Sequence, residues 1–310
     1  MKVISYAGVV SGSSKNPEKI QLLEKFIQGV NAKGDTGVFY QSNTLQSCDV
    51  AVIQGWQHEK GKRAPHLRLR EEVINNQLQN NKRVCVADAN LFLYATSQNE
   101  PHHYLRYSFD GVFRNTGIYF DDNPDPKRWQ QISKDLNIEL QPLKNNGSNI
   151  LICLQRDGGW SMQGQDIFDW TRKIVKNIRR FSDRNIIIRS HPGDKRAIHT
   201  YMPKIARHYY GDKTIKISIN KSLNYDLNNA YAVVNHNSSS IVGPIIMGHH
   251  AFITDPVTSQ CTDVSHVGFN DLENPKEFDR LKWLERISMC HWKFEELENG
   301  KMWEHIRKYC

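Results

Sequence analysis

The sequence of 310 residues contains few cysteines and none of the patterns that mark disulfide-stabilised or zinc-binding proteins. Its six cysteines form no C-x-x-C pair and no cysteine–histidine cluster, so we expect reduced, mostly buried thiols. No apolar run reaches the roughly 18 residues that a membrane helix needs. The first ten residues also hold too short an apolar stretch for a secretory signal. These absences predict a cytoplasmic chain without a membrane span.

Signature motifs of three large enzyme classes are missing as well. The glycine-containing segment at residues 8–15 lacks the G-x-x-x-x-G-K-[ST] spacing of a phosphate-binding loop, which argues against an ATPase. Because no G-x-G-x-x-G and no G-x-S-x-G is present, dehydrogenases and α/β-hydrolases lose their main support. A hydrophobic fraction of 39% with only 11 prolines is instead typical of a globular domain protein.

Positive charge exceeds negative charge, and the excess is local. The chain has 41 Lys and Arg against 33 Asp and Glu, a net charge of +8. Residues 171–216 carry 13 basic and 3 acidic side chains, and residues 59–83 carry 7 and 3. This surplus favours a polyanionic partner without identifying it.

Short apolar runs alternate with helical patterns along the chain, which predicts an α/β protein with parallel sheets and covering helices. Strands are expected at residues 3–10, 37–40, 50–54, 83–87, 149–154, 185–189, 214–217, 231–234 and 251–254. Helices are expected at residues 18–30, 67–79, 167–181 and 239–247. A polar stretch at 141–148 separates two sets of elements. We therefore predict domains at 1–145 and 146–277, and a helical tail at 278–310 that crosses back to the first domain.

Polar residues follow four of the predicted strands in the second half, where ligands bind in parallel α/β sheets. The loop after the first strand contains Gly158, Gly159, Trp160 and Ser161, and paired glycines permit close approach of backbone N–H groups to an anion. A simple turn is the alternative interpretation.

The other three strand ends carry charged or hydroxyl side chains. Arg189 and His191 can neutralise phosphate groups. The run Asn237-Ser238-Ser239 precedes a predicted helix, so it either caps that helix or helps bind a phosphate. Asp255 is either a turn residue or an acceptor for sugar hydroxyls.

The first half offers a candidate general base and a basic segment. Asp88 follows a predicted strand and is a carboxylate suited to proton abstraction, with Asp110 and His58 as weaker candidates. The basic side chains that could meet phosphates are Lys60, Lys62, Arg63, Arg68 and Arg70. Such a run is also common on a solvated face.

Taken in order, these segments resemble a known enzyme family. Asp157-Gly158-Gly159, Arg189-Ser190-His191-Pro192, Asn237-Ser238-Ser239 and Thr254-Asp255-Pro256 resemble motifs of two-domain GT-B glycosyltransferases, particularly capsule-type Kdo transferases and bacterial sialyltransferases. The ending His291-Trp292-Lys293-Phe294 with Trp303 is similar to a phage-encoded group of DNA-modifying glycosyltransferases. The likeness extends into the first half, at residues 66–70, 88–90 and 104–108.

The resemblance implies two Rossmann-like domains that face a cleft, with the C-terminal helices packed back on the first. It also implies a nucleotide-sugar donor, first of all a UDP-sugar, and no required metal. Carried over by position, the donor-binding residues are Gly158, Gly159, Trp160, Ser161, Arg189, His191, Asn237, Ser238, Ser239 and Asp255. Asp88 and His191 would be catalytic. Val242-Gly243-Pro244 stands where many GT-B enzymes have an acidic residue, which leaves the donor's base and sugar open.

Three acceptor hypotheses follow. The phage-like ending and the net charge favour double-stranded DNA with hydroxymethylated pyrimidines, 5-hydroxymethylcytosine first, whose target base would be flipped out. The basic segment from Lys60 to Arg70 would then hold the DNA backbone. A capsule or lipopolysaccharide glycan is the alternative acceptor, and an inert nucleic-acid-binding protein on a degenerate transferase scaffold is the third hypothesis.

Overall fold

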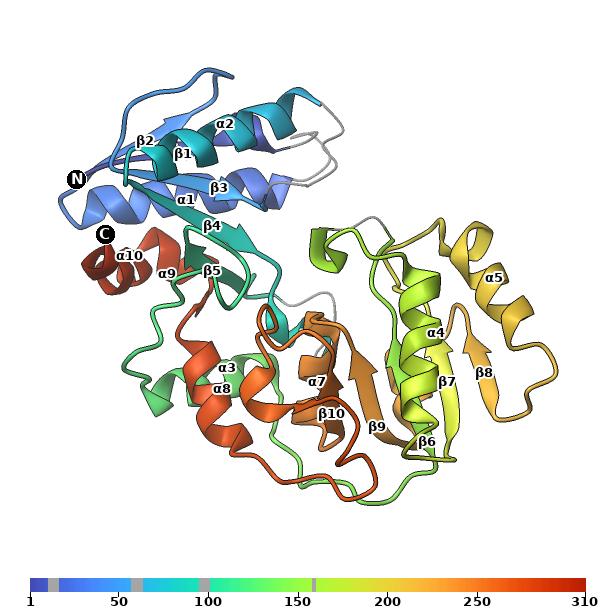
Figure 1. Cartoon of the computed structure of the whole chain (residues 1–310). Helices are drawn as coiled ribbons and strands as arrows, with labels where there is room; N and C mark the ends of the chain where they lie inside the picture. The colour runs from blue at the N-terminus through green and yellow to red at the C-terminus, as the bar shows by residue number, and fades with distance from the viewer. Residues whose placement is uncertain (11–16, 57–63, 95–100, 158–159) are drawn as a thin grey trace. The chain divides into compact units, whose positions relative to one another are not determined.

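The computed structural model describes residues 1–10, 17–56, 64–94, 101–157 and 160–310, and it divides into two compact units (Figure 1). Unit 1 comprises Met1–Leu91, the described part of 98–137, and Leu284–Cys310. Unit 2 comprises Ile138–Trp283 and a short segment that begins at Phe92. Each unit is built around its own six-stranded sheet.

The sheet of unit 1 has the strand order β12-β5-β4-β3-β1-β2. Four strands are parallel, as expected: β1 (Lys2–Tyr6), β2 (Thr36–Tyr40), β3 (Val50–Gln54) and β4 (Arg83–Asp88). One edge of the sheet adds two antiparallel strands that the sequence pattern did not predict. There β5 (Leu105–Phe109) runs antiparallel to β4, and β12 (His291–Trp292) runs antiparallel to β5.

The helices of unit 1 follow amphipathic patterns and local start signals. These helices are α1 (Pro17–Ala32), α2 (Pro65–Gln79), α3 (Pro126–Leu136), α9 (Phe294–Glu298) and α10 (Lys301–Ile306), and α8 (Arg280–Ser288) spans the boundary between the units. The start of α3 is set by two neighbouring residues. The side chain of Asp125 accepts a hydrogen bond from the backbone N–H of Lys127 at 3.0 Å, and Pro126 occupies the first turn.

The last 27 residues are an integral part of unit 1. Lys33, which follows the last residue of α1, pairs with Glu304 on α10 at 2.7 Å, and the indole N–H of Trp303 donates to Asp35 at 2.8 Å. Arg128 on α3 pairs with Glu296 and lies over the ring of Trp292 at 4.0 Å. Because Arg128 and Glu296 are both buried, their pairing contributes to a defined position for this segment.

Gly29 on α1 marks the closest approach of the C-terminal segment. A Cβ at this position would lie 1.9 Å from the carbonyl oxygen of Leu297. We expect Gly29→Ala to lower the free energy of unfolding by about 3 kcal/mol, because backbone would have to move to relieve the overlap. Urea denaturation measures the loss. The exposed neighbour Gln28 provides the control, since Gln28→Ala adds no atom at the contact.

The sheet of unit 2 is wholly parallel, with the order β11-β10-β9-β6-β7-β8. Its strands are β6 (Asn149–Cys153), β7 (Asn185–Arg189), β8 (Ile215–Ser218), β9 (Ala230–Asn235), β10 (His250–Ile253) and β11 (His266–Val267). Its helices are α4 (Ile167–Ile178), α5 (Tyr201–His208), α6 (Leu223–Leu227) and α7 (Val242–Ile246). These two sheets with covering helices confirm the α/β class.

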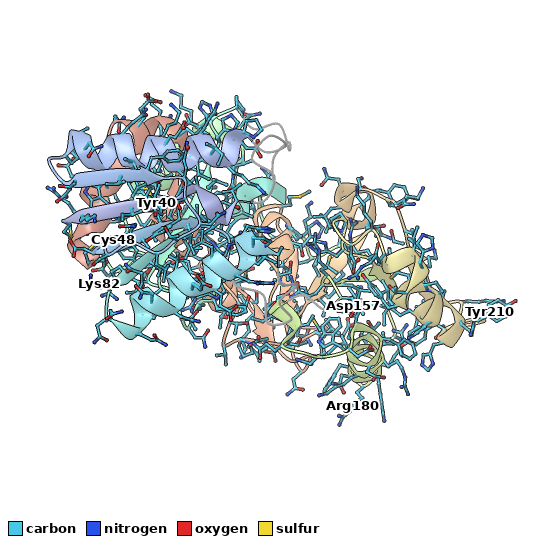
Figure 2. All side chains as sticks on the ribbon, turned by 90° about the horizontal axis from the view of Figure 1, so that it is seen from above. Tyr40, Cys48, Lys82, Asp157, Arg180 and Tyr210 are labelled. Carbon is cyan, nitrogen blue, oxygen red and sulfur yellow. The ribbon has the colours of Figure 1, made fainter. Side chains whose placement is uncertain are left out.

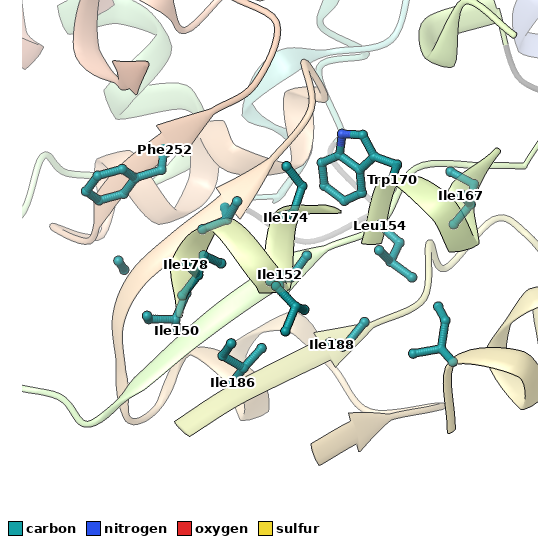
Figure 3. Packing of buried hydrophobic residues seen from close by; sticks show 14 of the residues in the cluster. Ile150, Ile152, Leu154, Ile167, Trp170, Ile174, Ile178, Ile186, Ile188 and Phe252 are labelled. Carbon is teal, nitrogen blue, oxygen red and sulfur yellow. The ribbon is translucent and has the colours of Figure 1, made fainter. Parts of the chain in front are cut away.

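One apolar cluster holds α4 and α5 on the same face of this sheet. The alternate residues Ile150 and Ile152 of β6, with Ile186 and Ile188 of β7, are fully buried against the inner side of α4 (Figure 3). Met202 and Ile205 of α5 belong to the same cluster. The exposed positions of α4 all carry polar side chains, so the outer side of this helix is a polar surface.

Candidate functional site

The polar residues singled out in the second half gather at the carboxyl edge of the unit 2 sheet. Strands β10, β9, β6 and β7 are consecutive neighbours in this parallel sheet, so the loops that follow them emerge side by side (Figure 1). Asp255, Asn237, Gln155 and His191 come from these four loops in that order. The sequence order alone does not show this adjacency, because β9 pairs with β6 and not with β8, the strand that precedes it in the sequence.

Asn237 is the centre of a hydrogen-bonded network that joins three loops. Its amide nitrogen lies 2.7 Å from the hydroxyl of Thr258 and 3.1 Å from Asp255, and 3.0 Å from the carbonyl oxygen of Ser161. Its amide oxygen accepts a hydrogen bond from the side chain of Gln155. The network fixes the Asn237 side chain, which is half-buried, in a single orientation.

Asp255 is held as a carboxylate. Burial raises its pKa, but hydrogen bonds from the hydroxyl and backbone N–H of Thr258, and from Asn237, outweigh burial and hold the pKa below its ordinary value. His236 lies 3.8 Å from the same carboxylate and contacts Thr254 at 2.7 Å. Burial lowers the pKa of His236, although the charge of Asp255 acts in the opposite direction.

Arg189 lies at the end of β7, but its guanidinium is already paired. It donates to Asp226 on α6 at 2.6 Å and to the carbonyl oxygen of Ser222 at 3.1 Å. Ser218 donates to Asp226 as well, at 2.8 Å. The side chains of Arg189 and Asp226 are 9% and 2% exposed, so this is a buried ion pair rather than a surface cation. Sequence reasoning missed Asp226, since no recognisable motif surrounds it.

His191 adopts a defined tautomer when neutral. Its Nδ1 accepts a hydrogen bond from the backbone N–H of Gly193 at 3.0 Å, so the proton of the neutral ring belongs to Nε2. Arg156 donates to the carbonyl oxygen of Gly193 at 2.9 Å, and the backbone N–H of Asp157 donates to Asp194 at 3.0 Å. These bonds join the loops after β6 and β7.

A pocket of about 480 Å³ opens beside His191 within unit 2. Its lining includes Arg189, Ser190 and Asp194. It also includes residues that sequence reasoning did not select, namely Lys195, Ser218, Asn220, Lys221 and Ser222. The neutral Nε2–H of His191 and the two lysines are donors suited to phosphate oxygens.

The serine-rich turn after β9 begins a helical segment, as expected, although a short one. Ser238 is the N-cap, and its hydroxyl accepts from the backbone N–H of Ser240 at 3.2 Å. Ser239–Ile241 form a 3₁₀ turn that continues into α7. Ser238, Ser239 and Ser161 are all half-buried. Gly158 and Gly159 lie outside the described residues, and Trp160 begins a 3₁₀ turn.

Two carboxylates selected in unit 1 are both paired with arginines. Asp88 ends β4 and accepts a hydrogen bond from Arg106, which lies opposite it on β5. Asp110 accepts from Arg83 at 2.6 Å and from the backbone N–H of Val84 at 2.9 Å. The bonds of Asp110 tie it to the start of β4, whereas Asp88 lies at the carboxyl end of that strand.

The basic residues selected in unit 1 divide into three groups. Arg70 is buried and donates to the carbonyl oxygens of Val9 and Trp56, so we withdraw it from the predicted surface cations. Arg68 is exposed on α2. Lys60, Lys62, Arg63 and His58 lie outside the described residues.

The His191 ring is expected to stay neutral to a lower pH than a free histidine. Burial, and next the charge of Arg156, lowers its pKa from 6.5. The stabilisation that comes from the neutral ring is therefore present above pH 6.5 and is lost as the pH falls below that value. NMR titration of the ring protons measures this, with the exposed His199 as the internal control. A His191 pKa at or above 6.5 would contradict the expected effects of burial and of the Arg156 charge.

No protein-family model and no curated protein matches this sequence. Solved structures do. The β-Kdo 2,4-transferase of Thermosulfurimonas dismutans KpsC has a TM-score of 0.53 at 13% identity, covering 94% of this chain and 90% of that one. The β-Kdo 2,7-transferase of the same protein has a TM-score of 0.51 at 12% identity, covering 100% of both chains. The chain has a GT-B glycosyltransferase-like fold.

In the part of this GT-B-like chain that the structure describes, no helix is long and apolar enough to span a bilayer. No group of three or more His, Cys, Asp or Glu side chains within the described ranges is arranged to hold a metal ion.

Proposed function

We propose that this chain is a glycosyltransferase that moves a sugar from a nucleotide-sugar, first of all a UDP-sugar, to a hydroxyl acceptor. The observation that carries the proposal is the convergence of four loops at one sheet edge. They present the Nε2–H of His191, the cation Lys195 and the ionised Asp255, and Lys221 joins them from the loop after β8. The likeness of the fold to two sugar transferases supports the same class of reaction.

The residues divide naturally into a phosphate part and a sugar part. His191 and the two lysines donate hydrogen bonds to the donor's phosphates, and this stabilises the negative charge that grows on the departing nucleotide. Asp255 and Asn237 face the sugar, where their oxygen and N–H groups can bind hydroxyls. Arg189 acts differently from the initial expectation. Its pairing with Asp226 makes it a positioning residue, which anchors the end of β7 beneath His191.

The proposed general base is Asp88. Its carboxylate would take the proton of the acceptor hydroxyl as the oxygen attacks C1 of the sugar, while the bond from C1 to the nucleotide phosphate breaks. The hydrogen bond from Arg106 holds this carboxylate at the end of β4.

For the acceptor, we propose DNA that carries hydroxymethylated pyrimidines, with 5-hydroxymethylcytosine first. The surplus of basic residues supports a polyanionic acceptor. A capsule or lipopolysaccharide glycan is the second candidate, and the likeness of the fold to the KpsC transferases supports it.

Mass spectrometry of reaction products distinguishes these acceptors. The protein is incubated with 5-hydroxymethylcytosine DNA, 5-hydroxymethyluracil DNA, unmodified DNA or anionic oligosaccharides, each with a panel of nucleotide-sugars. A sugar-sized mass gain confined to a hydroxymethylated base supports the DNA acceptor, and a gain on an oligosaccharide supports the glycan. If no acceptor gains mass and no donor shifts the melting temperature, the enzyme proposal fails in favour of an inert binding protein.

A further inference from the structure

The outer side of α4 carries a stripe of positive charge that the proposed donor site does not use. Arg172 and Lys176 lie four residues apart on α4, and Arg180 lies in the turn that follows the helix; all three are exposed. Residues four apart lie on one side of a helix, about 6 Å apart along its axis, so Arg172 and Lys176 share one side. Arg180 continues the positive charge past the C-terminal end of the helix, and we call these three side chains the α4 stripe.

Neighbouring residues extend the positive charge and add almost no negative charge. Lys173 on α4, and Lys204 and Arg207 on α5, are exposed as well. Within residues 167–180 and 201–208 the only carboxylate is Asp169, which lies 3.4 Å from Arg172 at the N-terminal end. Figure 2 shows Arg180 and Tyr210 projecting away from the ribbon beyond the ends of these two helices. Charge repulsion between so many cations is relieved when an anion binds.

Two concave surfaces flank α4. One, of about 440 Å³, lies between α4 and α5. Its lining includes the cations Arg172, Lys173 and Lys176, the carboxylate Asp169, and the rings of His208 and Tyr209. The other, of about 630 Å³, is lined by Lys173 and Arg180 and extends to His236 and Thr254. These last two residues contact the Asp255 network, so the second groove leads from the stripe to the proposed site.

The composition of the stripe favours a nucleic-acid backbone over a membrane surface. A helix that binds at a membrane surface inserts an apolar face into the lipid. The apolar face of α4 is instead buried against the sheet of unit 2. Two of the three stripe residues are arginines, whose planar guanidinium groups bind phosphate oxygens in pairs. A series of separate cations along α4 and the turn after it matches a linear polyanion with closely spaced charges better than a single small anion.

We propose that the α4 stripe binds the phosphate backbone of double-stranded DNA and that the adjoining groove leads the bound strand to the carboxyl edge of the unit 2 sheet. The inference rests on the proposed DNA acceptor. It places backbone binding on unit 2, in addition to the predicted basic segment of unit 1. The contacts are to phosphates, so they give affinity without sequence preference.

The test is a salt titration of binding to a short unmodified duplex, measured by fluorescence anisotropy without any nucleotide-sugar. The variant replaces Arg172, Lys176 and Arg180 with glutamine, which removes charge and keeps helix propensity. We expect affinity to fall roughly tenfold or more and the slope of log K against log salt to lose about 2.7, or 0.9 for each phosphate contact. A matched variant replaces the exposed unit 1 lysines Lys127, Lys134 and Lys308, and should change both quantities little.

Further measurements separate this inference from the proposed function. A second variant, with Arg172→Lys and Arg180→Lys and with Lys176 unchanged, keeps all three positive charges. It should show the wild-type salt slope, whereas a loss caused by a misfolded helix would persist in it. Equal losses in the stripe variant and the matched variant would overturn the inference, as would a stripe variant that binds DNA normally but loses binding to phosphatidylserine vesicles. Sugar transfer to hydroxymethylated DNA by a stripe variant with unchanged DNA affinity would leave the enzyme proposal intact. If the stripe variant loses DNA binding and the wild-type protein transfers no sugar to any acceptor, the DNA-binding surface is supported and the enzyme proposal fails.

Discussion

Replacing His191 with alanine is expected to reduce kcat by about 100-fold or more while leaving affinity for duplex DNA unchanged. The Nε2–H of His191 points from a loop that the neighbouring loop after β6 holds in place, so it is positioned before the donor arrives. Fixed donors of this kind act on charge that develops in the transition state, and removing one costs about 100-fold to 1000-fold in kcat. Steady-state kinetics of sugar transfer, together with anisotropy of DNA binding, measures both quantities.

Two variants sharpen this result. His191→Gln places an amide N–H near the position of Nε2 and should recover part of the lost rate. His199→Ala removes an exposed histidine of the same unit and should leave kcat unchanged. If His191→Ala lowers turnover and DNA affinity by the same factor, with the melting temperature unchanged, the assignment of His191 to the donor phosphates is wrong.

Much of the fold was predictable because its buried strands have a recognisable sequence pattern. The runs at Asn185–Arg189 and Val50–Gln54 are apolar, short and bounded by polar residues, and both strands were predicted at their observed bounds. The two antiparallel strands at the edge of unit 1 were missed for a physical reason. β12 contains only two residues, and it pairs with β5 across about 185 positions of sequence. Local periodicity carries no information about such a pairing.

The candidate site was predictable to the extent that it depends on strand ends. His191, Asn237 and Asp255 were found because they directly follow apolar strands, and the parallel sheet brings their loops to one edge. Their partners were harder to find. Thr258 offered a usable signal, since its backbone N–H bonds to the aspartate three residues before it, as in a helix cap. Asp226 offered none, because its role comes from a contact with β7 across 37 residues of sequence.

Breaking the buried Arg189–Asp226 pair should strongly destabilise unit 2. We expect Asp226→Ala to lower the free energy of unfolding by about 3–5 kcal/mol, because the guanidinium of Arg189 would remain buried without a countercharge. The Ser218 hydroxyl would lose its acceptor as well. Urea denaturation measures the loss. Asp169→Ala, which removes an exposed carboxylate from a surface pair, should cost less than about 1 kcal/mol.

The double variant Arg189→Met with Asp226→Leu separates stability from catalysis. Removing both charges avoids an unpaired buried ion, so most of the lost stability should return. If Arg189 only positions the loop after β7, this folded variant should retain measurable sugar transfer, with a lower kcat and a KM for the donor that changes little. A stable double variant whose KM for the donor rises steeply would show that Arg189 leaves Asp226 and binds the donor phosphates directly. The buried pair would then be the resting state of a donor-binding arginine, and Asp226 would be its competitor.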